Sequence, residues 1–193
     1  MLRIRQPKMS SDPLRRRLKY AYFYAMHYTF REASLGEVDA IWQILEQAIR
    51  RRRADGSRQW QDGYPNRDVV CDDIKKGVGY VLAVGTDVAG YCAVLQNDEP
   101  AYARIEGAWL TEGDFLVVHR VAISDSYIGQ GLAKKMLSAV EGLARDRNIN
   151  SIKADTNFDN PAMMHVFEAL GYHYCGDVMM RGAPRSAYEK VLV

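Results

Sequence analysis

The sequence has few of the residues that hold disulfides or metal ions. Its 193 residues include three cysteines and four histidines. Cys71, Cys92 and Cys175 form no CxxC pair, and the histidines lack the HExxH type of spacing that metal ligands show. From this cysteine usage we expect reduced thiols in a cytoplasmic protein, and we expect no metal.

Long apolar runs and a strong charge bias are missing as well. No apolar run approaches the ~18 residues of a membrane span, and no secretory signal pattern is found. The formal net charge is only +2, so nucleic acid is not favoured as the partner. Two arginine blocks, 15–17 and 50–53, leave that alternative open, and it predicts a steeply salt-dependent affinity for DNA or RNA. We expect no membrane partner and no nucleic-acid partner.

The composition is that of a globular domain. Hydrophobic residues make up 48% and charged residues 26%, which is ordinary for one folded unit of this length. Residues 1–25 differ because they are basic and then aromatic. We expect a loose extension there, with a targeting segment or membrane-touching arm as the alternative, followed by a single domain at 26–193.

Hydrophobic periodicity predicts an α/β order of elements. Ser34 and Glu37 form a capping-box pattern ahead of the first helix, and Asn160 with Pro161 is typical of the start of the last. Strands are predicted at 27–33, 79–84, 88–96, 114–123, 151–157, 172–181 and 186–193, and helices at 35–53, 69–76, 129–147 and 160–170. Residues 57–68 and 97–113 are predicted to be loops.

The predicted strand that ends at Ile123 leads through a short turn into Gly129-Gln130-Gly131-Leu132-Ala133, where a helix begins. Glycines let a backbone approach an anion, and the N-terminal amides and dipole of a helix attract it. This pattern indicates a phosphate-binding loop. Lys134 and Lys135 are out of register for a P-loop, and Lys134 stands where a dinucleotide fingerprint needs a small residue.

The loop resembles the acetyl-CoA pyrophosphate loop of the GNAT superfamily of N-acetyltransferases, which reads Arg or Gln, two residues, Gly, one residue, then Gly or Ala. Gly131 and Ala133 match, whereas Ile128 stands where Arg or Gln is usual. NPAMMHVFEALGY, from Asn160 to Tyr172, resembles a second motif of the family. The resemblance covers roughly 26–193 and implies a mixed, mostly antiparallel central sheet flanked by about four helices.

The resemblance also implies acetyl-CoA as the acetyl donor. Two strands of the family splay beside the loop, so the pantetheine arm can add to the sheet edge and a free backbone N–H can hold the oxyanion. The arginines at 50–53 either steer the CoA phosphates or form a solvated face. The residues expected to contact the donor are Val121, Ala122, Ile123, Gly129, Gln130, Gly131, Leu132, Ala133, Lys134, Asn157, Asn160 and Phe167.

The implied acceptor is a primary amine on a small molecule, an amino terminus or a lysine, attacking directly in a ternary complex. Trp60 and Tyr64 are candidates for the acceptor wall, or they pin their loop to the body. A lysine-like amine must lose a proton at a cost of about 4.6 kcal/mol at pH 7. His119 and Glu106 are the candidate bases, and Glu106 could instead hold a cationic acceptor.

The general acid is where the sequence departs from the family. A tyrosine usually stands seven residues after the helix-capping asparagine, but Phe167 stands there in this chain. Tyr172 and Tyr174 are the candidate substitutes. Together with Ile128, this departure supports an alternative function, a non-catalytic or weakly active CoA-binding sensor or scaffold with the GNAT fold. The oligomeric state stays open, with a homodimer as one alternative.

Overall fold

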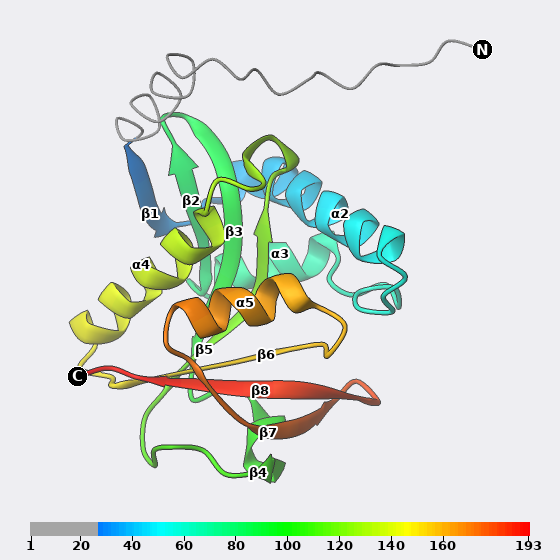
Figure 1. The fold of residues 1–193 in the computed structure, drawn as a ribbon. Helices are drawn as coiled ribbons and strands as arrows, with labels where there is room; N and C mark the ends of the chain where they lie inside the picture. The colour runs from blue at the N-terminus through cyan, green and yellow to red at the C-terminus, as the bar shows by residue number, and fades with distance from the viewer. Residues whose placement is uncertain (1–26) are drawn as a thin grey trace, which may run out of the picture.

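The computed structural model describes residues 27–193, and the predicted extension at 1–25 lies outside this range. The described residues form one eight-stranded sheet in the order β1-β2-β3-β5-β6-β8-β7-β4 (Figure 1). The strands are β1 (Tyr28–Glu32), β2 (Gly79–Val84), β3 (Asp87–Gln96), β4 (Glu106–Gly107), β5 (Leu116–Ile123), β6 (Ser151–Thr156), β7 (His173–Met180) and β8 (Ala183–Val191). The helices are α2 (Val38–Ala54), α3 (Arg67–Lys75), α4 (Leu132–Asp146) and α5 (Pro161–Ala169), with 3₁₀ turns η1 (Leu35–Glu37), η2 (Pro100–Arg104) and η3 (Asp125–Tyr127).

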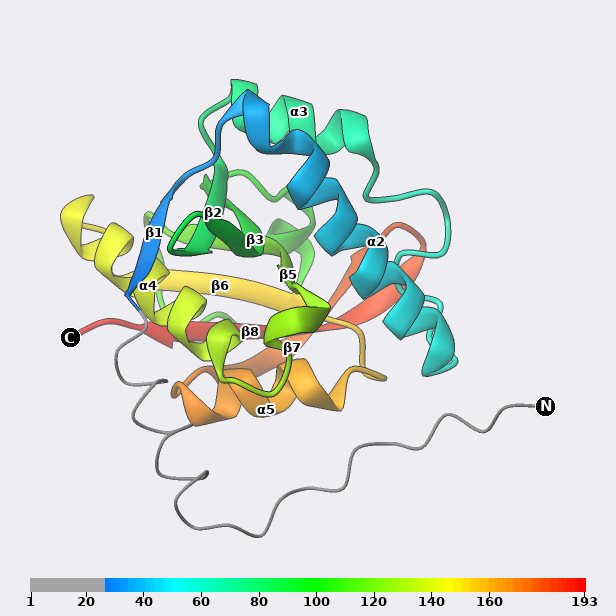
Figure 2. The same cartoon turned by 90° about the horizontal axis from the view of Figure 1, so that it is seen from above.

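Helices cover both faces of the sheet. Figure 2 shows α2 and α3 on one side of the strands and α4 and α5 on the other. Side chains alternate along β2, so Val81 packs into the cluster of α2 and α3, whereas Tyr80 and Leu82 pack into the cluster of α4. The predicted mixed, mostly antiparallel sheet with four α-helices is therefore confirmed.

The helix starts follow the sequence signals. Ser34 and Glu37 make the predicted capping box, with the Ser34 N–H donating to Oε2 of Glu37 at 2.9 Å. Asn160 caps α5 by accepting the Met163 N–H at 3.2 Å. Because each cap satisfies amides that have no partner inside the helix, these residues fix where the helices begin.

β5 and β6 form the parallel pair of the sheet, and they separate after three residues. Their pairing runs from Leu116 with Ile152 to Val118 with Ala154, although β5 continues to Ile123 and β6 to Thr156. On the other side of β5, the register against β3 shifts between Tyr91 and Ala93. The C-terminal half of β5 therefore has an open edge toward β6.

The predicted loop at 97–113 contains more structure than its sequence suggested, namely η2 and the short strand β4. β4 pairs with β7, and Gly107 faces Gly176 so closely that a Cβ on Gly107 would stand 2.1 Å from the Cys175 carbonyl oxygen. The following residues are held by the fully buried carboxylate of Glu189, which accepts the Leu110 N–H at 2.5 Å. Pairing of a two-residue strand leaves no periodicity to detect, which explains why the pattern missed it.

No helix within residues 27–193 is long and apolar enough to cross a membrane.

Candidate functional site

A cavity of about 410 Å³ opens where β5 and β6 separate. Its lining comes from both faces of the sheet, because the gap between the strands connects them. Residues from α5 and the adjacent strand ends, among them Val118, Thr156, Asn160, Met163 and Phe167, form one side. Residues from the 57–66 loop, η2, β5, β6 and the β7–β8 hairpin form the other: Gln59, Trp60, Tyr64, Asp98, Glu99, Ala101, His119, Arg120, Asp155, Met180, Arg181 and Arg185.

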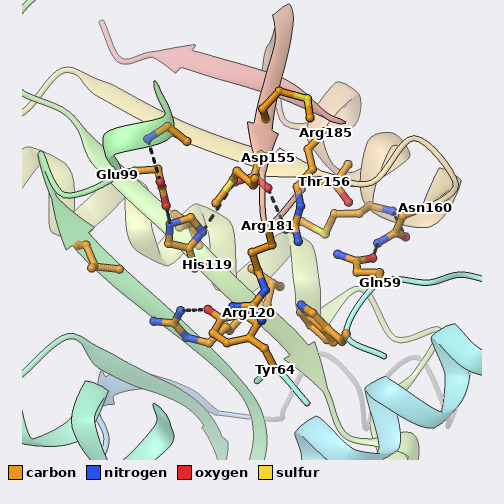
Figure 3. A pocket seen from close by; sticks show the side chains of 18 of the residues that line it. Gln59, Tyr64, Glu99, His119, Arg120, Asp155, Thr156, Asn160, Arg181 and Arg185 are labelled. Atoms are coloured by element: carbon orange, nitrogen blue, oxygen red, sulfur yellow. Dashed lines mark hydrogen bonds and ion pairs between the residues drawn. The ribbon is translucent and has the colours of Figure 1, made fainter. Parts of the chain in front are cut away.

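His119 lies between two carboxylates in this cavity (Figure 3). Its Nε2 is 3.1 Å from Oε2 of Glu99, whereas its Nδ1 is 3.7 Å from Oδ1 of Asp155. β5 supplies the histidine and β6 the aspartate, and Glu99 caps η2 by accepting the Ala101 N–H at 3.1 Å. The first contact has hydrogen-bond length and the second does not.

Asp155 is the more buried carboxylate of the two. It accepts a hydrogen bond from the Tyr102 hydroxyl at 2.9 Å and one from Nη1 of Arg185 at 3.1 Å. Its side chain is only 1% exposed. A carboxylate that far from water needs such partners, so Tyr102 and Arg185 hold the Asp155 side chain beside His119.

The pKa of Glu99 is lowered. Burial acts to raise it, but the hydrogen bonds with His119 and the Ala101 N–H outweigh burial. Glu99 and Asp155 together with the one guanidinium of Arg185 leave one negative charge around the imidazole. The arrangement can therefore hold one positive charge, on a ligand or on His119 itself.

The opposite wall is made of arginines and Tyr64. Arg120 forms a two-pronged ion pair with Asp73, and it also donates to the Tyr64 hydroxyl. The guanidinium of Arg181 lies 4.4 Å from the centre of the Tyr64 ring and binds Asp62 at 2.8 Å. Tyr64 is thus fixed between two cations in the wall of the cavity.

The side toward α5 carries polar atoms without a protein partner. Oγ1 of Thr156 and Oδ1 of Asn157 are buried, and neither has a hydrogen-bond partner among the described residues. Buried polar atoms of this kind are normally paired. Thr156 belongs to the lining of the cavity, whereas Asn157 lies outside it.

The glycine loop follows β5 and η3 and leads into α4. Gly131 has φ +74° and precedes the helix, and a Cβ there would meet nothing within 4 Å. The first helical bond is Lys135 N–H to the Gly131 carbonyl at 3.2 Å, so the amides of Leu132, Ala133 and Lys134 have no acceptor inside the helix. Open space in front of free amides at a helix N-terminus suits a phosphate.

Two arginines of the 50–53 block hold the connections on either side of the gap. Arg51 donates to the carbonyl of Ile123 at 2.8 Å, at the end of β5. Arg52 donates to the backbone and side chain of Asp159 at 2.7 and 2.8 Å, just before α5. These two side chains are therefore part of the scaffold of the gap and not a solvated face.

The structure brings many predicted residues to the cavity, namely Trp60, Tyr64, His119, Val121, Asn160 and Phe167. It does not bring Glu106 there, because Glu106 is exposed in β4 opposite Asp177. Tyr174 is also away from the lining, 57% exposed with its hydroxyl on Asp177 at 3.0 Å. Tyr172 is buried against Phe167 and lies outside the lining.

Sequence reasoning missed Glu99, Asp155, Arg120 and Arg185. Asp155 had a usable signal, since it is the one acidic residue of a predicted strand, SIKADT. Glu99 precedes Pro100, a pattern of helix starts. Among the described residues, no group of three or more His, Cys, Asp or Glu side chains could hold a metal ion.

The chain is similar to known proteins in sequence and in fold. A family model described as "Acetyltransferase (GNAT) family" matches residues 40–172. A curated relative, the "Uncharacterized N-acetyltransferase YesJ" of Bacillus subtilis, is 24% identical over 159 residues, which cover 80% of this chain and 83% of that protein. A GNAT-family acetyltransferase structure from Streptococcus agalactiae is 36% identical, with TM-score 0.80 over 87% of this chain and 99% of that one. The fold is also shared with yncA of Salmonella typhimurium, solved with acetyl-CoA, at 17% identity and TM-score 0.64 over 86% and 95% of the two chains.

Proposed function

We propose, for a chain that belongs to the acetyltransferase (GNAT) family, that the cavity transfers an acetyl group from acetyl-CoA to a primary amine by direct attack in a ternary complex. The observation that carries the proposal is the place of His119. It lies between two carboxylates, at the point where the sheet opens toward a glycine loop.

The residues present fit acetyl-CoA, which supplies the acetyl group as a thioester. The amides of Leu132, Ala133 and Lys134 are placed to bind its diphosphate. Thr156, which lines the cavity, offers an unpartnered hydroxyl oxygen for the polar arm. Backbone N–H groups near Val121, where β5 has lost β6 as a neighbour, are placed to donate to the acetyl carbonyl oxygen.

The proton of the acceptor amine has a defined route in this proposal. The acceptor enters as an ammonium ion that Glu99 and Asp155 attract. Nδ1 of His119, 3.7 Å from Asp155, takes the proton and leaves a neutral amine as nucleophile. The imidazolium that results lies between two carboxylates, so the arrangement stabilises the protonated base at the moment when it forms.

At the position where the family usually has a tyrosine as the general acid, this chain has Phe167, which has no hydroxyl group. Phe167 is 1% exposed and lines the cavity. The thiol of the leaving group has a reference pKa of ~8.5, so it can depart as a thiolate, which then takes up the second proton that the attacking nitrogen releases. In our proposal, catalysis therefore depends on the base and the backbone donors.

Phe167 and Ile128 together favour a second candidate function, a CoA-binding sensor or scaffold with little turnover. Phe167 cannot donate a proton, and Ile128 is 51% exposed where a polar contact to the donor is usual. The experiment that decides is acceptor-dependent release of free CoA thiol, measured with a panel of amines. Release that depends on an amine supports the enzyme, whereas tight acetyl-CoA binding without such release supports the sensor.

A further inference from the structure

We propose that Arg120 is a positioning residue that couples the acceptor wall to the strand that receives the acetyl group, an inference that rests on the proposed function. Arg120 has φ +57° in the middle of β5. Only glycine adopts this region readily. A bulky side chain there persists when its surroundings hold it.

The backbone at Arg120 is a bulge. In the register against β3, His119 faces Ala93 and Ala122 faces Tyr91. Two residues of β5, Arg120 and Val121, therefore lie opposite one residue of β3, Cys92. Since β5 has also left β6 after Val118, this bulge sets the direction of the backbone donors beside the cavity.

Buried contacts of the side chain hold the bulge in place. Arg120 donates to Asp73 of α3 through Nε at 2.9 Å and Nη2 at 2.7 Å, and the two side chains are 8% and 7% exposed. Asp73 also accepts the Tyr91 hydroxyl at 2.6 Å, and Tyr91 is fully buried on β3. The bulge is thus tied to α3 and to β3 at once.

The third contact reaches the acceptor wall. Nη1 of Arg120 donates to the Tyr64 hydroxyl, and the Arg181 guanidinium covers the Tyr64 ring at 4.4 Å (Figure 3). One planar guanidinium therefore joins the bulge to the loop that faces the acceptor. A lysine could not do this, because one ammonium cannot reproduce the fork on Asp73 and reach Tyr64 as well.

The decisive variant is Arg120→Gly. Glycine accepts φ +57° without strain, so the bulge can form while the link is lost. We expect the Kd for acetyl-CoA to stay within about twofold and kcat/KM for the acceptor to fall at least about tenfold, as for one lost charge-assisted bond. Asn148→Gly is the matched control, since Asn148 has φ +56° and lies outside the cavity, and it should keep full activity.

Tyr64→Phe tests the link without disturbing the buried ion pair between Arg120 and Asp73. If Arg120→Gly alone fails to fold, the double variant Arg120→Gly with Asp73→Asn replaces it, because it leaves no buried carboxylate without a partner. We expect Tyr64→Phe to raise the acceptor KM and to add nothing in the Arg120→Gly background. Full activity of Arg120→Gly would overturn the inference. So would independent effects of Arg120→Gly and Tyr64→Phe that multiply in the double variant. A kcat loss equal to the unfolded fraction of the protein, with both KM values unchanged, would also overturn it. Absence of transfer by the unmodified enzyme would instead refute the proposed function.

Discussion

Nε2 of His119 and Oε2 of Glu99 lie 3.1 Å apart, and both side chains are largely buried. In the proposed mechanism, Nε2 faces Glu99, and Nδ1, which lies 3.7 Å from Oδ1 of Asp155, takes the proton of the acceptor. The pair therefore sets the direction in which the imidazole can take a proton. That direction is toward Asp155 and the cavity.

Replacing His119 should lower turnover without weakening donor binding. We expect His119→Gln to reduce kcat for an alkylamine by about 10²- to 10⁴-fold, the usual contribution of a general base. The Kd for acetyl-CoA, measured by calorimetry, should not change, because in the proposed mechanism His119 contacts the acceptor and not the donor. His173→Gln is the control, since His173 is exposed at the start of β7. Unchanged kcat in His119→Gln would remove the base from the mechanism.

Gly131 should be sensitive to an acidic substitution. Gly131→Asp combines a strained φ of +74° with a negative charge in front of the free amides, so we expect acetyl-CoA affinity to drop at least about 100-fold. Gly142→Ala is the matched control within α4, where a methyl group meets nothing within 4 Å. It should raise stability by about 0.5–1 kcal/mol and leave the Kd unchanged. Equal affinity for the two variants would show that the diphosphate binds elsewhere.

The framework of the fold could be predicted because local signals were strong. The continuous apolar runs of β2 and β3 and the caps at Ser34 and Asn160 are signals that act within a few residues, and the structure has them as predicted. β4 was not predictable in this way. It exists because Gly107 and Gly176, far apart in the sequence, allow two backbones to touch.

In the candidate site, too, local patterns could be predicted from the sequence, whereas contacts between distant residues could not. The glycine loop is a local pattern, and its geometry follows from a few consecutive residues. Glu99 meets His119 only after η2 folds back over β5, and Arg120 meets Asp73 across 47 positions of the chain. The apolar neighbours of Glu106 in the sequence favoured it as a site residue, but Glu99 lines the cavity, whereas Glu106 is exposed in β4.

Acid should weaken the junction between β1 and α2 through Glu37. Its hydrogen bonds with Arg31, and then those from Ser34, lower the pKa of Glu37 to about 2. A lowered carboxyl pKa adds stability above the unfolded pKa of about 4.3, and this contribution is lost as pH falls toward 2. Because the pair lies at the surface, we expect about 1 kcal/mol. The Tm difference between the unmodified protein and Glu37→Gln should be present at pH 7 and vanish near pH 2. A difference that does not depend on pH would contradict this.

The charges of the cavity predict its preference among amines. Each lining guanidinium already has a carboxylate: Arg120 has Asp73, Arg181 has Asp62 and Arg185 has Asp155. Asp98 lines the cavity and has no ion pair among the described residues. An acceptor with a second positive charge should therefore bind better than a neutral-tailed amine, and an acceptor with a carboxylate should bind worse.

Three acceptors with one four-carbon stem isolate this effect. We expect kcat/KM to decrease from 1,4-diaminobutane to butylamine to 4-aminobutyrate, by about fivefold per step, the size of an exposed ion pair. Asp98→Asn should reduce the first step, because it removes the unpaired carboxylate. Glu112→Gln, an exposed acid outside the lining, should leave both steps intact. A preference for 4-aminobutyrate would contradict this and would mean that an arginine of the cavity binds the substrate carboxylate in place of its protein partner. Arg185 would then be the residue to replace, because its Nε is buried and has no hydrogen-bond partner among the described residues.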